Sequence, residues 1–235
     1  FDPEESVPYA KIPYEVNNCK KHQELALRAA EKSIVLLKNA DNFLPISFKN
    51  KTVAVIGPNA DDEKALWGNY NGFPEKTITP LAGLRLAAQN PTQIEFAPGT
   101  TLSKPDENLL TNALTIARKA DIIVLCLGLS QALEGEEGAM LKEGDRSTLG
   151  LPPNQLHLCE QISKLYKPII LVLLNGSPIL LDWAVKDPNI KAVIEAWYPG
   201  QAGGTAIANI LLGYTSPSGR LPITFPMKMD DIPPI

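Results

Sequence analysis

Histidine and cysteine are scarce in this chain of 235 residues. It has two histidines, His22 and His157, and three cysteines, Cys19, Cys126 and Cys159, with no CxxC spacing. This pattern predicts neither a disulfide framework nor a zinc site. Cys126 stands in an apolar stretch, so we expect a small buried residue. Carboxylates alone still allow a hard cation, but a solvated acidic surface is the simpler interpretation, and we predict no metal and no other cofactor.

The chain also lacks a long apolar run and an excess of positive charge. No run approaches the roughly 20 residues that span a bilayer, and the first residues, FDPEESVPYAKIP, lack the features of a signal peptide. The net charge is -4, and the 22 basic residues are scattered. A nucleic acid or an anionic membrane would need a basic stripe. We therefore expect neither as a partner, and the chain is either cytosolic or has lost its leader.

What the sequence does contain is an alternation of apolar strands with amphipathic helices. The expected strands cover residues 51–57, 93–96, 121–128, 168–175 and 191–196, and the expected helices cover 22–39, 81–88, 109–119, 154–166 and 205–212. Helical turns are expected at 63–66, capped by Asn59 or Asp61, and at 179–185, and a short edge strand at 221–225. This alternation predicts an α/β fold, a three-layer α/β/α sandwich with a mostly parallel sheet.

The segment after the strand at 121–128 is the first candidate for chemistry. Five acidic residues fall within twelve positions that also hold three glycines: Glu134, Glu136, Glu137, Glu143 and Asp145. Open α/β sheets bind ligands at the carboxyl ends of their strands. Glycosyl transfer needs two carboxyl groups, one of them protonated, and crowding among carboxylates opposes ionisation and raises a pKa. The spacing alone also fits a solvated acidic loop.

Three other motifs favour competing functions less well. The stretch from Gly128 to Ala132 resembles a nucleophile elbow around Ser130, but alanine replaces its last glycine and no helix follows. GPNAD at 57–61 has one glycine where nucleotide-binding turns need several. WGNYNGFP at 67–74 has two aromatic residues expected to be exposed between glycines. It is either a packed turn or a platform for a sugar ring.

Four segments in the right order resemble one known family. They are SIVLLKNADNFLPI (33–46), VAVIGPNAD (53–61), the stretch from EGEEG to GLPPNQ (134–155), and WYPGQAGGTAIANILLGYTSPSGRLPITFP (197–226). Together they look like the C-terminal α/β sandwich domain of glycoside hydrolase family 3. The resemblance implies a retaining, exo-acting glycosidase that releases terminal β-linked sugars from an oligosaccharide or β-glycoside. A preceding barrel domain would supply an aspartate nucleophile, and the sandwich would supply the general acid/base.

The same resemblance suggests site residues. It puts the acid/base in the acidic loop: matching Gly135-Glu136 to the family motif favours Glu136, counting from Gly128 favours Glu134, and Glu137 comes third. NYNG at 69–72 is more similar to the β-xylosidase branch than to the β-glucosidase branch, with Asn69 and Tyr70 near the aglycone. Arg146, next to Asp145, is expected either to pin the loop through an ion pair or to contact substrate.

The resemblance also implies a domain layout. Residues 1–21 would be a linker that follows the barrel, 22–228 the sandwich domain, and 229–235 a tail that leads to a possible further domain. The full protein would be periplasmic or secreted, and the isolated chain would be inactive without its nucleophile. The competing function is a non-catalytic sandwich that binds carbohydrate or a protein partner.

Overall fold

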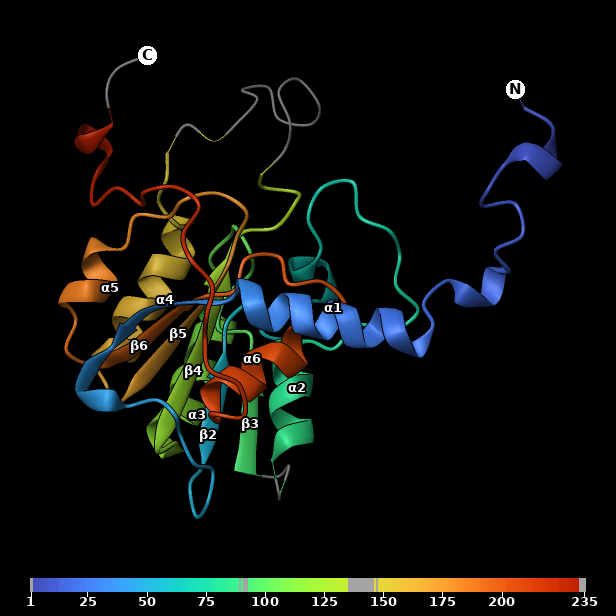
Figure 1. Ribbon diagram of the computed structural model, residues 1–235. Helices are drawn as coiled ribbons and strands as arrows, with labels where there is room; N and C mark the ends of the chain where they lie inside the picture. Colours follow the sequence, from blue (N-terminus) through green and yellow to red (C-terminus); the bar gives the residue numbers. More distant parts are fainter. Residues whose placement is uncertain (1, 89, 91–92, 135–145, 147, 233–235) are drawn as a thin grey trace.

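The sheet has six strands, of which five are parallel. The computed structural model describes residues 2–88, 90, 93–134, 146 and 148–232. Within these ranges the strand order is β1-β6-β5-β4-β2-β3 (Figure 1). The strands are β1 (Val35–Asn39), β2 (Val53–Ile56), β3 (Ile94–Ala97), β4 (Ile122–Gly128), β5 (Ile169–Leu174) and β6 (Ile190–Glu195). Every pair is parallel except β1 with β6, which confirms a mostly parallel sheet.

The middle strands are covered on both faces. Every residue of β2, β4 and β5 is buried, including Cys126 in β4. A strand buried on both sides reads as a continuous apolar run because neither of its faces meets water. This is why VAVI, IIVLCLG and IILVLL were recognisable from the sequence.

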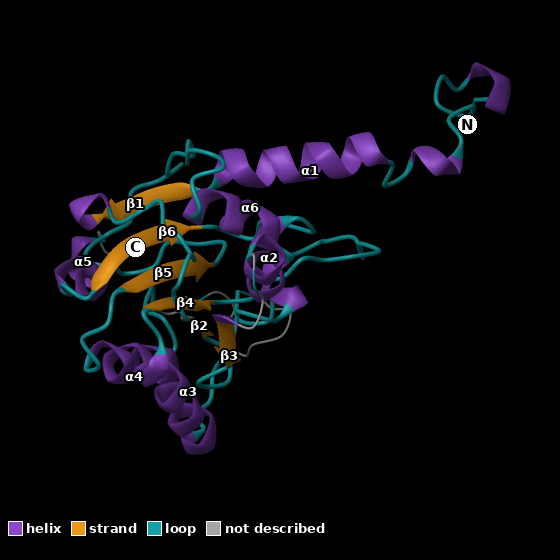
Figure 2. Cartoon of the chain, turned by 90° about the horizontal axis from the view of Figure 1, so that it is seen from below, coloured by secondary structure: helices purple, strands orange, loops and turns teal. Residues whose placement is uncertain are grey.

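Helices form a layer on each side of this sheet. They are α1 (Lys20–Ser33), α2 (Pro80–Ala87), α3 (Glu107–Lys119), α4 (Pro153–Ser163), α5 (Asp182–Lys186) and α6 (Gly203–Leu211). One apolar core packs under α1, α2 and α6, and a second packs under α3, α4 and α5. Figure 2 shows the two layers on opposite sides of the sheet. The three-layer sandwich is therefore confirmed.

The predicted helix at 22–39 is wrong in its last third. Helix α1 ends at Ser33, and Val35–Asn39 forms β1, which pairs antiparallel with β6. The apolar residues Ile34, Val35 and Leu36 fit a helical and a strand pattern equally well. The unpaired edge of β6 decides between the two patterns by supplying backbone partners.

Two smaller predictions also fail. Residues 221–225 form no strand, and the edges of the described sheet are β1 and β3. The turn Glu63–Leu66 is a 3₁₀ helix, and its cap is Asp62, whose side chain accepts from the Lys64 N–H at 2.9 Å. Asn59 is instead fully buried and donates to the carbonyl of Leu129 at 2.8 Å, so it ties the loop after β2 to the loop after β4.

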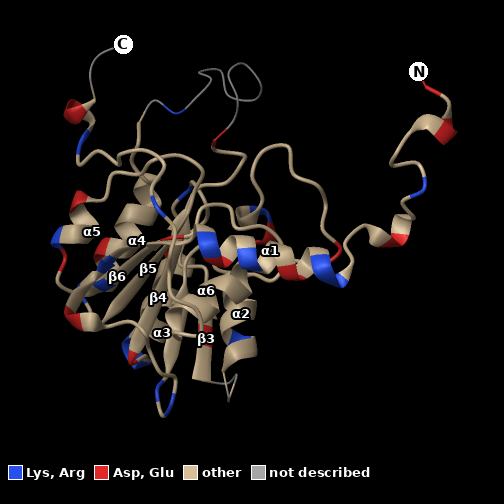
Figure 3. Cartoon of the chain, in the orientation of Figure 1, with Lys and Arg blue, Asp and Glu red and all other residues tan. Residues whose placement is uncertain are grey.

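The first residues extend away from the sandwich, past the start of α1 (Figure 1). They form two short 3₁₀ helices, Glu4–Ser6 and Tyr14–Val16, and Tyr14 is 83% exposed. Asn18 links this segment to the sandwich: it donates to Glu75 and accepts from Gln201, each at 3.4 Å. None of the helices in the described ranges has the length and apolarity needed to cross a membrane. Lys and Arg are spread over helices and loops (Figure 3).

Candidate active site

The candidate site lies where β4, β5 and β6 end. The three strands are parallel neighbours, so the loops that follow them meet at one edge of the sheet. The loop after β4 brings Glu134, the loop after β5 brings Gly176 and Ser177, and the loop after β6 brings Tyr198. The acidic loop thus leaves the sheet at the edge where the sequence predicted a ligand site.

Glu134 is held by groups from all three loops. Its Oε2 accepts from the Gly176 backbone N–H at 2.7 Å and from the Tyr198 hydroxyl. Its Oε1 accepts from the Ser177 hydroxyl and, at 3.5 Å, from Arg146. The side chain is only 12% exposed. A carboxylate with a donor on every side is fixed in orientation, and each donor to a charged acceptor adds stabilisation.

Arg146 follows the acidic loop and binds the turn after β5, which also binds Glu134. Its guanidinium donates to Ser177 Oγ at 2.6 Å, to the Gly150 carbonyl at 3.2 Å and to the Pro178 carbonyl at 3.4 Å. Burial lowers its pKa, and the charge of Glu134 opposes that shift. Glu134 and Arg146 therefore anchor both ends of the stretch 135–145 on the turn after β5.

Gly176 has to be a glycine for this arrangement to form. A Cβ at this position would lie 2.9 Å from the Tyr198 ring and 3.3 Å from Glu134 Oε2. A side chain would therefore push the tyrosine and the carboxylate away from the backbone N–H. Because Gly176 has no side chain, its own N–H from the loop after β5 and the Tyr198 hydroxyl from the loop after β6 can both donate to the Glu134 carboxylate.

The aromatic loop at 67–74 lies beside this cluster. Asn69 donates its side-chain amide to the carbonyl of Glu134 at 2.8 Å, so a predicted aglycone residue is bound to the acidic loop. Tyr70 is 83% exposed with a left-handed backbone (φ 60°), and Phe73 is 90% exposed. Trp67 is partly buried and packs edge-to-face on Phe73, with ring centroids 6.3 Å apart. The loop thus has two exposed aromatic residues, as the sequence predicted, and they are Tyr70 and Phe73.

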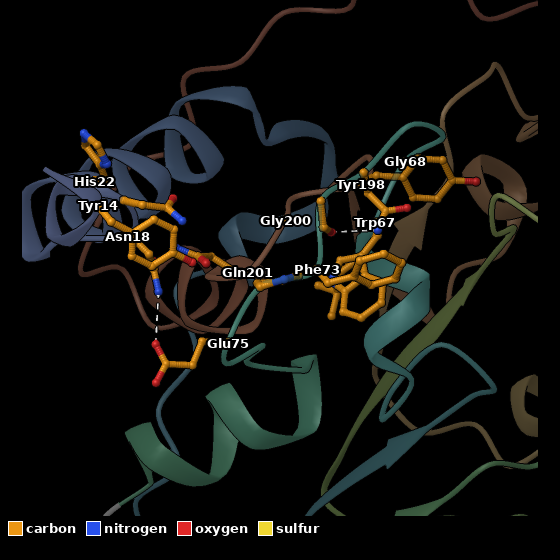
Figure 4. Close-up of a pocket in the computed structure, with 15 residues that line it drawn as sticks. Tyr14, Asn18, His22, Trp67, Gly68, Phe73, Glu75, Tyr198, Gly200 and Gln201 are labelled. Atoms are coloured by element: carbon orange, nitrogen blue, oxygen red, sulfur yellow. Dashed lines mark hydrogen bonds between the residues drawn. The ribbon is translucent and has the colours of Figure 1, made fainter. Parts of the chain in front are cut away.

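A cavity of about 740 Å³ opens between this loop and the N-terminal segment. Figure 4 shows its wall, which includes Tyr14, Trp67, Phe73, Glu75, Tyr198 and Gln201. Tyr198 belongs to both places, since its ring lines the cavity and its hydroxyl bonds Glu134. The site therefore combines an anchored carboxylate with an adjacent hollow rich in aromatic rings.

Beneath the cluster lies a second carboxyl group, Glu195, the last residue of β6. It is fully buried and accepts from the Trp197 backbone N–H and from the side-chain amide of Asn175. Burial raises the pKa of Glu195 to about 8. The two hydrogen bonds oppose this shift, and the negative charge of Glu134 adds to it.

The residues of the nucleophile-elbow motif have structural roles, and the described residues form no metal site. Ser130 is buried, and its Oγ accepts from the Ala132 N–H at 3.2 Å, so it shapes a turn. His157 lies exposed on α4. No three His, Cys, Asp or Glu side chains come together as metal ligands in the part of the chain that the structure describes.

The sequence predicted some site residues and missed others. The structure brings Glu134, Asn69 and Arg146 together, with Tyr70 beside them. Glu136, Glu137, Glu143 and Asp145 lie outside the described residues. Sequence reasoning missed Gly176, Ser177, Tyr198 and Glu195. The signal was available, because NGS (175–177) and EAWY (195–198) stand at the carboxyl ends of two predicted parallel strands, and those strand ends share an edge with the acidic loop.

The fold and the site define a class: a doubly wound α/β domain that anchors an acidic loop at the carboxyl edge of its sheet. Residues 34–235 match the family model for the glycosyl hydrolase family 3 C-terminal domain. The chain belongs to this family.

Individual relatives agree with the family match. A beta-xylosidase from Formosa agariphila is 36% identical over 220 residues, 91% of this chain and 29% of that protein. The structure of a family 3 exo-beta-xylosidase (XlnD), in complex with a xylobiose aziridine activity-based probe, has a TM-score of 0.82 and 36% identity, and the match covers 92% of this chain and 27% of that one. The structure of a beta-glucosidase from Erythrobacter marinus has a TM-score of 0.85 and 31% identity, and the match covers 94% of this chain and 32% of that one. The chain therefore spans less than a third of these relatives.

Proposed function

We propose that this chain is the C-terminal domain of a retaining, exo-acting glycosidase that releases terminal β-linked sugars. The observation that carries the proposal is the acidic loop anchored by Glu134 and Arg146 at the carboxyl edge of the sheet, beside an aromatic cavity. The named xylosidase and glucosidase relatives support it. Since the chain spans less than a third of their length, the nucleophile, an aspartate, would come from the rest of the protein, a barrel domain.

The chain would contribute the proton donor to a double displacement. The aspartate attacks the anomeric carbon while a glutamic acid of the acidic loop protonates the departing glycosidic oxygen. The resulting carboxylate then takes a proton from water, whose oxygen attacks the anomeric carbon and displaces the aspartate. No cofactor is needed, because both steps only move protons and the glycosyl group.

We assign the proton donor to Glu136 and a positioning role to Glu134. A proton donor must carry a hydrogen and present it to the substrate, whereas the Glu134 carboxylate already accepts from Gly176, Ser177, Tyr198 and Arg146. Those donors suit an ionised acceptor. Two positions further on, Glu136 would be carried on the loop that this anchor holds. Glu134 is the alternative donor.

We expect β-xylosides as preferred substrates and β-glucosides next. The exposed ring of Tyr70 and the neighbouring Phe73 offer flat apolar faces, and the C–H face of a sugar ring packs well on such a surface. Asn69 would hold this loop next to the donor through its bond to Glu134. Arg146 would act on substrate only indirectly, by fixing the loop.

The test compares Glu136→Ala with Glu134→Ala in the full-length protein, using aryl β-xylosides with good and poor leaving groups. Loss of a general acid slows reactions by about 100- to 10,000-fold, and a good leaving group needs no proton. We therefore expect Glu136→Ala to cripple hydrolysis of the poor leaving group and largely spare the good one. Glu134→Ala should slow both to a similar extent, because it disturbs position and not proton supply.

Glu160→Ala, an exposed glutamate on α4, is the matched control and should behave like the wild type. If Glu136→Ala resembles the wild type while Glu134→Ala shows the leaving-group dependence, the donor is Glu134. If the full-length protein hydrolyses no β-glycoside, the proposed activity is wrong.

A further inference from the structure

Glu195 has a position that its burial alone does not explain. It is fully buried at the carboxyl end of β6, flanked in register by Leu173 of β5 and Val35 of β1. A carboxyl group buried between apolar strands costs free energy unless hydrogen bonds replace its water. The hydrogen bonds of Glu195 indicate which part of the structure its burial stabilises.

Each oxygen of Glu195 is bound to a different turn of the candidate site. Oε1 accepts from the backbone N–H of Trp197 at 2.9 Å, and Oε2 accepts from Asn175 Nδ2 at 3.0 Å. Trp197 has a left-handed backbone (φ 59°), which disfavours a large side chain. The bond to Glu195 holds this unfavourable turn in place.

The other ends of these two turns grip Glu134. Asn175 also donates to the Ser177 carbonyl at 2.9 Å, which sets the turn that directs Gly176 N–H and the Ser177 hydroxyl at Glu134. Tyr198, next to Trp197, donates its hydroxyl to the same carboxylate. Three of the four groups that hold Glu134 therefore sit on turns fastened to Glu195.

We propose that Glu195 is a positioning residue, which clamps the turns after β5 and β6 so that Gly176, Ser177 and Tyr198 meet Glu134 and fix it at the start of the acidic loop. This inference rests on the proposed function for its catalytic consequence. Its structural part concerns only the described side chains and can be tested without any turnover.

Charge gives this clamp a pH dependence. Among the described residues, Glu134 is the titratable group whose charge acts on Glu195, Tyr198 and Arg146 are bonded to Glu134, and the strand neighbours Leu173 and Val35 are apolar. The raised pKa, about 8, leaves Glu195 neutral at pH 7. The folded chain then holds a proton that the unfolded chain releases near pH 4.5. The stabilisation is complete below pH 4.5 and is lost as the pH rises through about 8.

The test uses hydrogen exchange and steady-state kinetics on the full-length protein, with Glu195→Ala, Glu195→Gln and Asn175→Ala. The Gln variant is permanently neutral. Its oxygen can still accept from the Trp197 N–H, but its amide would then face the Asn175 amide that donates to Glu195 Oε2, so this variant keeps the bond to Trp197 and loses the bond to Asn175. We expect Glu195→Ala and Asn175→Ala to reduce the protection of the Gly176 amide, Glu195→Ala also to remove that of the Trp197 amide, and Glu195→Gln to keep the protection at Trp197.

Three further results are expected. In the wild type, protection of these amides falls above about pH 8 after correction for intrinsic exchange, and in Glu195→Gln it does not. The kcat/KM of Glu195→Ala falls by about 10- to 100-fold, the cost of a misplaced catalytic group. Ionisation of the general acid lowers kcat/KM at alkaline pH in both proteins, and a further fall near pH 8 is present in the wild type and absent in Glu195→Gln.

Asn154→Ala is the matched control. Asn154 is also a buried asparagine, and it donates to the turn at 100–104, away from Glu134. It should lose protection at that turn only. Unchanged protection at Gly176 in Glu195→Ala, or an equal loss there in Asn154→Ala, overturns the proposal. A full-length protein without glycosidase activity would refute the proposed function, while the exchange data would still decide the role of Glu195.

Discussion

Arg146 illustrates how single side chains fix this site. Its guanidinium reaches the Ser177 hydroxyl, two backbone carbonyls and Glu134 from one rigid planar group. Arginine presents five N–H donors in a fixed fork, whereas lysine offers one compact ammonium on a flexible stem. The side chain is 13% exposed, so if the guanidinium were removed, water could not reach all of its acceptors. The contacts depend on the shape of the group as well as on its charge.

We therefore predict that Arg146→Lys lowers the free energy of unfolding by about 2 kcal/mol, because buried acceptors of a charged donor are left without partners. Urea unfolding measures this effect. Arg118→Lys, an exposed residue of α3, keeps the same chemistry at the surface and should change stability little. Equal effects of the two substitutions would mean that the guanidinium geometry is not needed.

Among the secondary-structure elements, the crossing of α2 and α6 positions the loop that carries Tyr198. Gly83 of α2 and Gly204 of α6 lie back to back, and a Cβ on Gly83 would be 2.0 Å from the Gly204 carbonyl oxygen. Because neither glycine has a side chain, the backbones of α2 and α6 come into direct contact. It also brings Ile78 within reach of the β6 loop, where Ile78 N–H donates to Gln201 and Gly204 N–H donates to Ile78, both at 2.8 Å.

We predict that Gly204→Ala destabilises the fold by about 3 kcal/mol, the upper end for overpacking. The added Cβ would lie 1.9 Å from the Thr79 carbonyl oxygen, a backbone atom that cannot rotate away. Thermal unfolding of this variant is compared with Gly72→Ala, where a Cβ meets nothing within 4 Å. A Gly204→Ala variant as stable as Gly72→Ala would show that the two helices can separate without loss.

For the molecule as a whole, the proposed function gives this chain one side of a catalytic pair. Where β4, β5 and β6 end, the described carboxyl groups are Glu134, which accepts from four donors, and Glu195, which is buried. The relatives are about three times longer than this chain. Retaining hydrolysis needs a nucleophile opposite the proton donor, with the two carboxyl groups about 5 Å apart. Under the proposed function that partner comes from the remainder of the protein.

We therefore predict that the chain of residues 1–235 does not hydrolyse an aryl β-xyloside, while the full-length protein does. Release of the aryl group is followed by absorbance at equal molar concentrations. Circular dichroism of the chain confirms that a lack of turnover is not a lack of folding. Robust turnover by the purified chain would contradict both the prediction and the division of roles behind it.

Burial explains which parts of the fold were predictable. β2, β4 and β5 were identified because strands covered on both faces must be apolar throughout. The helices α2, α3 and α6 came within about two residues of their predicted limits, within the usual uncertainty of helix ends. β1 was missed because VLLKN has no pattern of its own, and its strand form depends on pairing with β6.

The amino-acid sequence alone specified the layers, the alternation of β2 to β6 with helices, and the family, and it predicted the acidic loop as the place for chemistry. These follow from periodicity and local composition, which act over a few neighbouring residues. Only the tertiary structure decided that Glu134 meets Gly176, Ser177 and Tyr198, residues 42 to 64 positions away, and that Glu195 lies beneath them. Such contacts depend on which strands lie side by side and where each one ends, and no local pattern in the chain encodes that.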